Sequence, residues 1–219
     1  MAVKACLFDL DGVIVDTAKY HYLAWKRLAN ELGFDFTEQD NERLKGVSRV
    51  RSLEILLEIG GLSLDEATKE QLAAKKNVWY VESISTMDER EILPGVKSFF
   101  AAIRAAGIKT ALGSASKNAM MILKNVGMVQ SFDAIVDGNH TSQAKPDPEV
   151  FLLGAKALGL NPEDCVVFED AESGIEAATR AGMRSVGMGS SEHLGQATIV
   201  ISAMTEMSLE RLIALGESN

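Results

Sequence analysis

The sequence has no long uninterrupted run of apolar residues. A helix that crosses a lipid bilayer needs about 20 such residues in a row, and the chain of 219 residues contains no run of that kind. The apolar stretch at the N-terminus is also too short for a signal peptide, because it soon meets Asp9 and Asp11. We therefore expect a soluble cytoplasmic protein without a membrane partner.

Cysteine and basic residues are scarce as well. The 2 cysteines, Cys6 and Cys165, lie in short apolar runs without metal-ligand spacing, so we expect buried thiols in a reducing compartment. There are 22 Lys and Arg residues against 31 Asp and Glu residues, and the net charge is −9. A surface of this sign argues against a nucleic-acid partner. An anionic ligand would have to be bound by a few individual Lys and Arg side chains.

A dinucleotide-binding fingerprint is missing too. No Gly-x-Gly-x-x-Gly follows the first apolar run, which excludes a nucleotide-binding oxidoreductase built on that motif.

What the sequence does contain is an alternation of short apolar runs with helix-like segments. The runs are typical of buried strands, and a glycine follows each helix-like segment, where a helix C-terminal cap is expected. This alternation predicts an α/β fold, a Rossmann-like doubly wound parallel sheet with helices on both faces. The predicted strands are residues 3–8, 108–112, 134–136, 165–168, 185–188 and 198–201, and the predicted helices are residues 96–106, 117–126, 148–158 and 173–181.

The alternation stops between residues 16 and 87, where no convincing strand is found. Three helices are expected there: one over residues 17–32, one over residues 48–59, and a longer one that runs to about residue 83, for which Ser63 and Glu66 have the spacing of an N-terminal capping box. We therefore predict a helical cap domain of residues 16–87. It is inserted into a core domain made of residues 1–15 and 88–219. Nothing in the pattern demands more than a monomer.

Polar residues collect at the carboxyl ends of the predicted strands, which is where open parallel sheets bind ligands. Four carboxylates would repel one another there unless a cation lay among them, and hard oxygen ligands of this type favour Mg²⁺. We therefore expect a Mg²⁺ site. The residues at these strand ends are Asp9, Asp11, Ser114, Lys145, Glu169 and Asp170.

The most specific motif is Leu7-Phe8-Asp9-Leu10-Asp11-Gly12-Val13. If strand geometry continues through it, Asp9 and Asp11 point the same way, with Asp9 placed to attack phosphorus and Asp11 to act as general acid and base. The Ser114 hydroxyl and its turn, together with Lys145, suit a transferring phosphate. Taken singly, these residues could be an acidic turn, a helix N-cap and a surface lysine. Their occurrence together favours catalysis.

The predicted cap carries a basic turn, Lys45-Gly46-Val47-Ser48-Arg49. A phosphatase needs one phosphate site, whereas a mutase that works through a sugar bisphosphate needs two. Arg49 offers a bidentate fork for the second phosphate; the alternative is a solvated helix start with Ser48 as its N-cap. His21 shares a helix face with Thr17 and Trp25, and its nearness in sequence to Asp11 favours a role in the site over simple packing.

These motifs, in this order, resemble the haloacid dehalogenase superfamily of phosphotransferases. The resemblance covers essentially the whole chain, with the helical insert matching the superfamily's cap domain. It implies Asp9 as nucleophile and Asp11 as acid and base, with Mg²⁺ held by Asp9, the Asp11 backbone carbonyl, Glu169 and Asp170. It also implies that Ser114, Ala115 and Lys145 bind the transferring phosphate.

The cap motifs further resemble the β-phosphoglucomutase family, through segments 16–21, 44–49 and 114–118 with Ala24-Trp25, Ser52 and Lys76-Asn77. The resemblance implies interconversion of β-glucose 1-phosphate and glucose 6-phosphate. Arg49, Ser116, Lys117 and Asn118 would hold the phosphate that is not transferred. Thr17, His21 and Lys76 would position the acid and base, and Gly46, Val47, Ser48 and Ser52 would contact the sugar.

Two alternatives stay open. One is a sugar- or polyol-phosphate phosphatase on the same scaffold. The other is a non-catalytic phosphosugar sensor, which the intact Asp9 and Asp11 pair argues against. The chain departs from the family pattern at Val50 and Arg51, which we expect to add positive charge near the cap phosphate site, and in the loop 137–144.

Overall fold

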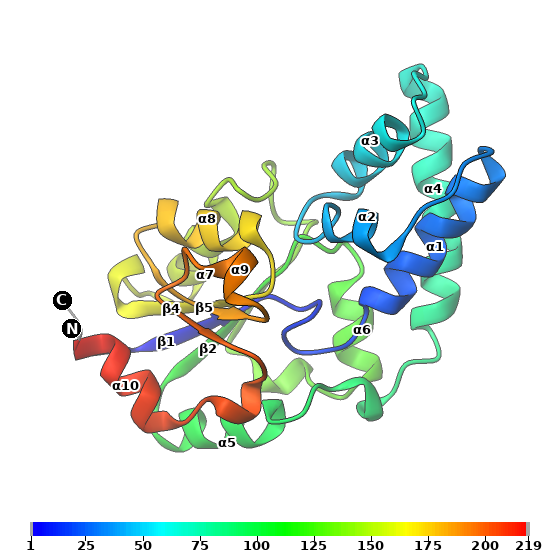
Figure 1. Ribbon diagram of the computed structural model, residues 1–219. Helices are drawn as coiled ribbons and strands as arrows, with labels where there is room; N and C mark the ends of the chain where they lie inside the picture. Colours follow the sequence, from blue (N-terminus) through cyan, green and yellow to red (C-terminus); the bar gives the residue numbers. More distant parts are fainter. Residues whose placement is uncertain (1, 218–219) are drawn as a thin grey trace.

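The computed structural model describes residues 2–217. Its centre is a parallel sheet of 6 strands in the order β3-β2-β1-β4-β5-β6 (Figure 1). The six predicted strands are confirmed, and β1 pairs with both β2 and β4. In a doubly wound sheet, ligands bind outside the carboxyl ends of the strands at such a switch point. The strands are β1 (Ala5–Phe8), β2 (Lys109–Gly113), β3 (Ala134–Val136), β4 (Cys165–Glu169), β5 (Arg184–Met188) and β6 (Ile199–Ile201).

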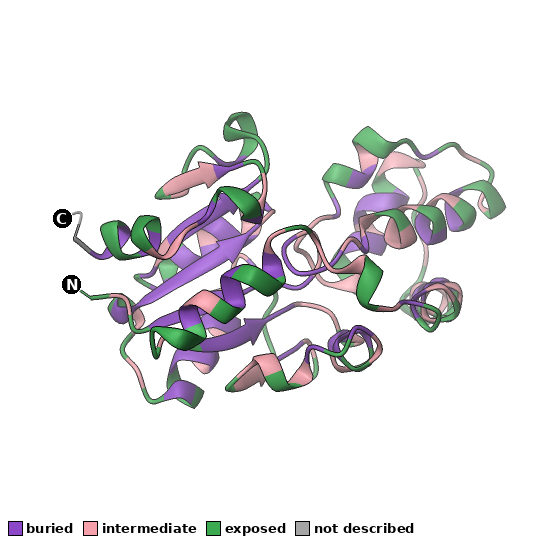
Figure 2. Ribbon diagram, turned by 90° about the horizontal axis from the view of Figure 1, so that it is seen from below, coloured by how far each residue is buried: buried purple, intermediate pink, exposed green. Residues whose placement is uncertain are grey.

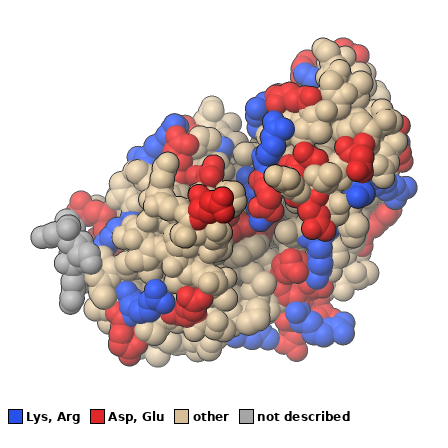
Figure 3. Space-filling model, viewed as in Figure 1, with Lys and Arg blue, Asp and Glu red and all other residues tan. Residues whose placement is uncertain are grey.

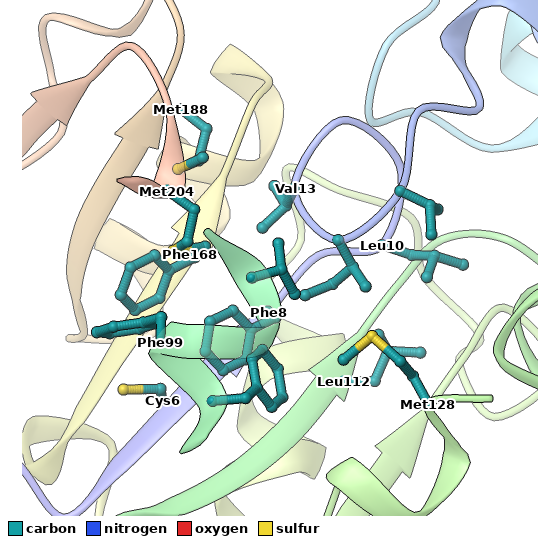
Figure 4. Packing of buried hydrophobic residues seen from close by; sticks show 14 of the residues in the cluster. Cys6, Phe8, Leu10, Val13, Phe99, Leu112, Met128, Phe168, Met188 and Met204 are labelled. Carbon is teal, nitrogen blue, oxygen red and sulfur yellow. The ribbon is translucent and has the colours of Figure 1, made fainter. Parts of the chain in front are cut away.

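Helices cover both faces of the sheet, as predicted. Successive side chains of a strand point to opposite faces, so Phe8 joins the apolar cluster under α5, α6 and α10, whereas Leu7 joins the cluster under α7 and α8. The Phe8 ring lies 4.8 Å from the Phe168 ring and 4.5 Å from the Phe100 ring (Figure 4). Figure 2 shows the central strands buried, the edge strands partly exposed and the outer helix faces exposed. The helices that follow the cap are α5 (Val96–Ala105), α6 (Ala119–Asn125), α7 (Glu149–Leu158), α8 (Glu172–Arg180), α9 (Ser191–Leu194) and α10 (Leu209–Glu217), with short 3-10 turns η1 (Glu89–Glu91), η2 (Val129–Ser131), η3 (Pro162–Asp164) and η4 (Met204–Glu206).

The segment between β1 and α5 is helical, and Figure 1 shows it set apart from the sheet in blue and cyan. It has an apolar cluster of its own, in which Trp25, Leu28, Leu53 and Leu56 are buried. The chain is thus an α/β core with an inserted helical cap, and the limits of the cap at residues 16 and 87 stay a prediction. The cap helices are α1 (Ala18–Glu31), α2 (Glu38–Glu42), α3 (Arg49–Ile59) and α4 (Glu66–Ile84).

Some local predictions were wrong. The N-cap of α4 is Asp65, whose carboxylate accepts the Thr68 N–H at 2.9 Å, so Ser63 and Glu66 form no capping box. Helix α6 begins at Ala119 rather than at Lys117, because the preceding residues form a turn of their own. Helices α2, α9 and α10 were not predicted. Cys6 and Cys165 are buried free thiols, as expected. Among the helices within residues 2–217, none has the length and apolarity that a membrane crossing requires.

One charged side chain interrupts the apolar interior of the cap. Lys76 is 2% exposed, and its ammonium lies 4.4 Å from the centre of the Trp25 ring and 4.7 Å from that of Tyr80. The same nitrogen is 3.0 Å from His21 Nδ1. Burial, together with the neighbouring Arg49 charge and against the opposing charge of Asp11, lowers the pKa of Lys76 to about 7. Burying a charged side chain of this kind lowers the stability of the fold, so a role other than stabilisation is expected for it.

We expect Lys76→Met to stabilise the folded protein at neutral and lower pH. The unfolded chain keeps the Lys76 proton up to its ordinary pKa of 10.5, whereas the folded chain gives it up near 7. Below the folded value, the wild-type fold must bury a charge. We expect a gain of about 1–2 kcal/mol in the free energy of unfolding, because lost cation–π contacts offset part of the gain.

Thermal unfolding across pH tests this prediction. As the pH rises from about 7 towards 10.5, the unfolded wild type binds more protons than the folded one, so wild-type stability rises and the advantage of the variant shrinks. Lys75→Met on the same helix is the matched control, because the Lys75 side chain is 51% exposed. A variant that is less stable than wild type below neutral pH would contradict the lowered pKa.

Candidate active site

The carboxyl ends of β1, β2 and β4 bring the predicted catalytic residues to one edge of the sheet. Asp9 follows β1, Ser114 follows β2, and Glu169 ends β4 with Asp170 directly after it. The prediction that strand geometry continues to Asp11 was wrong, because β1 ends at Phe8 and the chain turns. The Asp11 N–H donates to Asp9 Oδ2 at 3.0 Å. This turn, and not strand alternation, lets both carboxylates line the same cavity.

Lys145 is the buried cation of this edge. Its ammonium lies 2.6 Å from Asp9 Oδ1 and 2.5 Å from Glu169 Oε1, and its side chain is 1% exposed. Burial alone would lower the pKa of Lys145, but the two carboxylates more than offset this and hold it above its usual range. Lys145 is therefore charged, and it orients the carboxylate of Asp9 from the side of the loop before α7.

One ammonium does not balance the four carboxylates of this edge. Burial raises the pKa of Asp170 well above its usual range, and the charges of Glu169 and Asp9 add to the effect. Burial likewise raises the pKa of Asp11 to about 6, with Asp9 adding and the hydrogen bond from Thr17 opposing. These shifts indicate that positive charge is lacking. A divalent cation beside Asp9 and Asp170 would supply it.

The carboxylate side chains of this edge do not already form a complete set of metal ligands. Within residues 2–217, no three His, Cys, Asp or Glu side chains already converge as ligands, and the Glu169 carboxylate contacts Lys145 and accepts the Ala171 N–H at 3.0 Å. Gly12 leaves room for Asp170, because a Cβ at Gly12 would overlap its carboxylate. Carboxylate oxygens such as those of Asp9 and Asp170, which line the cavity, suit a hard cation that keeps several waters.

The turn after β2 forms the second wall of the site. Ser114 is fully buried and its hydroxyl accepts the Ser116 N–H at 3.1 Å, while the Ser116 hydroxyl accepts the Asn118 N–H at 3.2 Å. The Asn118 side chain donates to Asn77 Oδ1 of α4 at 3.0 Å. This turn therefore touches both the strand that carries the catalytic edge and the cap.

A chain of contacts from the cap reaches Asp11. The Thr17 hydroxyl donates to Asp11 Oδ1, and His21 Nε2 lies 3.9 Å from the same oxygen. His21 stacks on Tyr80 with ring centres 4.0 Å apart. Burial lowers the pKa of His21, and the charges of Lys76 and Arg49 lower it further, so the imidazole is neutral. Asp11 is thus held by neutral partners, with a pKa suited to giving and taking a proton near neutral pH.

A cavity of about 470 Å³ lies between core and cap, and Figure 3 shows the surface hollowed between the two parts, with charged side chains at its rim. Two predicted site residues, Thr17 and Glu169, are absent from its wall and lie behind Asp11 and Lys145. The predicted residues that line it are Asp9, Asp11, His21, Gly46, Val47, Ser48, Arg49, Ser52, Lys76, Ser114, Ala115, Ser116, Lys117, Asn118, Lys145 and Asp170.

The sequence analysis missed several residues of the wall. Tyr80 carried a usable signal, because it lies one helical turn after Lys76 on the same face of α4. The others lie on separate elements and share no local pattern. The missed residues include Asn41, Ala73, Tyr80 and loop residues 141–144, whereas Trp25, Leu44, Lys45 and Asn77 stand in motifs that the sequence analysis named.

Besides Lys45, which pairs with Glu42, and Lys76, the cavity is lined by Arg49 from the cap and Lys117 from the core. Neither Arg49 nor Lys117 forms an ion pair with another residue among 2–217, although burial lowers the pKa of Arg49. Arg51 differs: it pairs with Glu54 at 2.9 Å and Glu58 at 3.1 Å. The expectation that Arg51 adds positive charge to the cap site was therefore wrong. Arg49 and Lys117 therefore leave positive charge in the cavity that is available to an anionic ligand.

Comparisons with known proteins agree with this geometry. The chain is 42% identical over 212 residues to a β-phosphoglucomutase of Bacillus subtilis, covering 96% of this chain and 94% of the relative. It is 35% identical over 182 residues to a fructose-1-phosphate phosphatase of Escherichia coli, covering 82% and 93%. The crystal structure of a β-phosphoglucomutase from Clostridium difficile superimposes with a TM-score of 0.93 at 41% identity, covering 98% of this chain and 97% of that one. The model of the haloacid dehalogenase-like hydrolases matches residues 3–182. The chain therefore belongs to the haloacid dehalogenase-like hydrolase family.

Proposed function

We propose that the chain interconverts β-D-glucose 1-phosphate and D-glucose 6-phosphate through a phosphoaspartyl enzyme and a β-glucose 1,6-bisphosphate intermediate. This proposal rests on one observation: two cationic side chains, Arg49 and Lys117, line the same cavity as Asp9 and form no ion pair within residues 2–217. A bisphosphate needs a cationic group at each end, and Lys145 serves the other end. The names of the Bacillus and Clostridium relatives give the same activity.

The reaction begins with a phosphoryl group on Asp9. The 6-hydroxyl of β-glucose 1-phosphate attacks that phosphorus and Asp11 takes the hydroxyl proton, so the Asp9 carboxylate leaves and the bisphosphate forms. The bisphosphate then turns over in the cavity. Asp9 attacks the phosphorus of the 1-phosphate, and Asp11 returns its proton to the sugar oxygen that leaves. Glucose 6-phosphate is released and Asp9 is phosphorylated again.

The other residues bind, orient and exclude water. Lys145, Ser114 and the Ala115 backbone hold the phosphoryl group in transfer, while Arg49, Ser116, Lys117 and Asn118 hold the phosphate at the far end. Gly46, Val47, Ser48 and Ser52 contact the sugar, and Thr17, His21 and Lys76 orient Asp11. Asp9, Asp170 and the Asp11 carbonyl, with Glu169 beside them, would hold Mg²⁺, which would supply neutralisation of phosphate charge.

Closure of residues 16–87 as one cap over the core keeps water from the phosphoaspartate. Gly46 supports this role, because a Cβ at Gly46 would lie 2.6 Å from the Ser173 hydroxyl of the core. The enzyme works as a cytoplasmic monomer on a small sugar phosphate, and its net charge of −9 disfavours nucleic acid. A sugar-phosphate phosphatase is the second candidate, on account of the Escherichia coli relative.

A product assay tests the function. The protein is incubated with Mg²⁺, β-glucose 1-phosphate and a trace of glucose 1,6-bisphosphate, and glucose 6-phosphate and free phosphate are followed together. We expect glucose 6-phosphate far in excess of phosphate. Chelation by EDTA should abolish both products, and added Mg²⁺ should restore them. Phosphate as the main product would overturn the mutase in favour of the phosphatase.

Asp9→Asn should lower turnover by a factor of at least about 10³, because an amide cannot form the phosphoryl intermediate. The variant is compared with Asp35→Asn, since the Asp35 side chain is 75% exposed at the far end of the cap. The measurements are the rate of glucose 6-phosphate formation and the mass of the protein after exposure to bisphosphate. A variant that keeps wild-type turnover would disprove Asp9 as the nucleophile.

Arg49→Ala should lower kcat/KM for β-glucose 1-phosphate about 10- to 100-fold, the loss expected for a charge-assisted hydrogen bond to phosphate. Release of phosphate from acetyl phosphate, which carries no second phosphate, should fall much less. Arg51→Ala is the matched control, because its partners Glu54 and Glu58 lie on the outside of α3. Equal losses with both substrates would argue against a second phosphate position at Arg49.

A further inference from the structure

The loop between β3 and α7 contacts the turn after β2 and leads into Lys145. Residues 137–144 lead from β3 to Lys145, and five of them, Gly138 and residues 141–144, line the cavity. The sequence of this loop departs from the family pattern. Two carboxylates, Asp137 at its start and Glu149 just after it, receive most of its hydrogen bonds.

We propose that this loop positions the two phosphate sites through two separate contacts. The second phosphate site is taken from the proposed function, on which this inference rests. Asn139 positions the turn that holds the second phosphate, and Glu149 positions Lys145 beside the transferring phosphate. Neither side chain lines the cavity, so each acts through another residue.

The first contact joins Asn139 to the turn after β2. Asn139 Nδ2 donates to the Lys117 carbonyl at 3.0 Å, and the Gly138 N–H donates to the Ser116 carbonyl at 3.3 Å. Gly138 lies against the Ala115 carbonyl and has no room for a Cβ. A trans peptide points its C=O and N–H in opposite directions. Tying these carbonyls to the loop therefore directs the next N–H groups of the turn away from it.

Asp137 fixes Asn139 in place. Its side chain is 4% exposed, and its Oδ1 accepts the Asn139 N–H at 2.9 Å and lies 2.8 Å from His140 Nδ1. Asn139 Nδ2 is also within 3.3 Å of Asp137 Oδ2. The Asn139 side-chain amide, which donates to the Lys117 carbonyl, is thus already fixed before any ligand binds. Less conformational entropy is therefore lost when phosphate binds.

The second contact joins Glu149 to the segment that precedes Lys145. The Glu149 carboxylate accepts the Ser142 N–H at 2.8 Å and the Gln143 N–H at 2.6 Å, with the Ser142 hydroxyl at 3.1 Å. Hydrogen bonds from these backbone groups lower the pKa of Glu149, so it is charged. The backbone fixed in this way ends two residues before Lys145, whose ammonium reaches Asp9.

The two contacts predict effects on different measurements. Loss of the Asn139 contact should weaken bisphosphate binding, whereas loss of the Glu149 contact should slow acetyl phosphate hydrolysis. Asn139→Ala and Asn139→Asp, which keeps the size but cannot donate to the Lys117 carbonyl, should raise the Kd for glucose 1,6-bisphosphate about fivefold or more. The same variants should change phosphate release from acetyl phosphate by less than about twofold. Glu149→Ala should lower kcat for acetyl phosphate about tenfold, because Lys145 loses its position beside Asp9.

Bisphosphate binding is measured by calorimetry in the Asp9→Asn background, where turnover is blocked, and acetyl phosphate hydrolysis in the Asp9 background. Matched controls are Asn161→Ala, an exposed loop residue whose side chain caps nothing, and Glu210→Ala, in the first turn of α10. Thermal unfolding shows that each variant is folded. If Glu149→Ala does not fold, Glu149→Gln replaces it, since an amide keeps one acceptor oxygen.

Different measurements test the roles of Asn139 and Glu149 and the proposed function. A wild type that releases only phosphate would overturn the mutase, while the binding and hydrolysis measurements still decide the roles of Asn139 and Glu149. The inference is overturned if the Asn139 variants weaken both measurements alike, or if the Glu149 variant leaves acetyl phosphate hydrolysis at the wild-type rate.

Discussion

The concentration of negative charge at the carboxyl ends of β1 and β4 is the constraint on which the rest of this structure depends. Four carboxylates meet where the sheet has its switch point, and Lys145 is the one buried ammonium that pairs with them among residues 2–217. Charges interact more strongly where water is excluded. The Lys145 contacts to Asp9 and Glu169 are therefore needed for the fold as well as for the chemistry. Glycines accommodate the crowding: a Cβ at Gly12 would overlap Asp170, and one at Gly174 would overlap Glu169.

The cap adds cations without carboxylate partners to Lys117, the unpaired cation that the core contributes to the cavity. Arg49 and Lys76 come from α3 and α4, and both have lowered pKa values because burial disfavours their charged forms. Such residues destabilise an empty cavity and are stabilised when a dianion enters it. In the proposed function, binding energy from a phosphate beside these cations would be available to close the cap over Asp9, and the hydrogen bond between Asn77 and Asn118 already joins cap and core.

Asp11 and Asp9 have different kinds of neighbour, and this difference separates acid–base chemistry from phosphate binding. Asp11 is contacted by Thr17 and by an imidazole whose pKa burial holds below its ordinary range. A charged partner at this position would hold Asp11 ionised. Tyr80 stacks against His21 and forms the back of this arrangement. Asp9, the proposed nucleophile, is in contrast paired directly with the Lys145 ammonium.

The sequence by itself determined the strands, most helices and the identity of the catalytic edge, because apolar runs and the polar residues that end them are local patterns. It could not choose Asp65 over Ser63 as the α4 cap, since both are polar residues near the same helix start. It missed α2, which is 5 residues long. Only tertiary structure decided which charges are neutralised. Arg49 and Arg51 are two residues apart, yet the helix turns one towards the cavity and the other towards Glu54 and Glu58. The sequence gives no distance between chain segments, and the bridge from Lys145 to Asp9 and the stacking of Tyr80 on His21 exist only once those segments have packed.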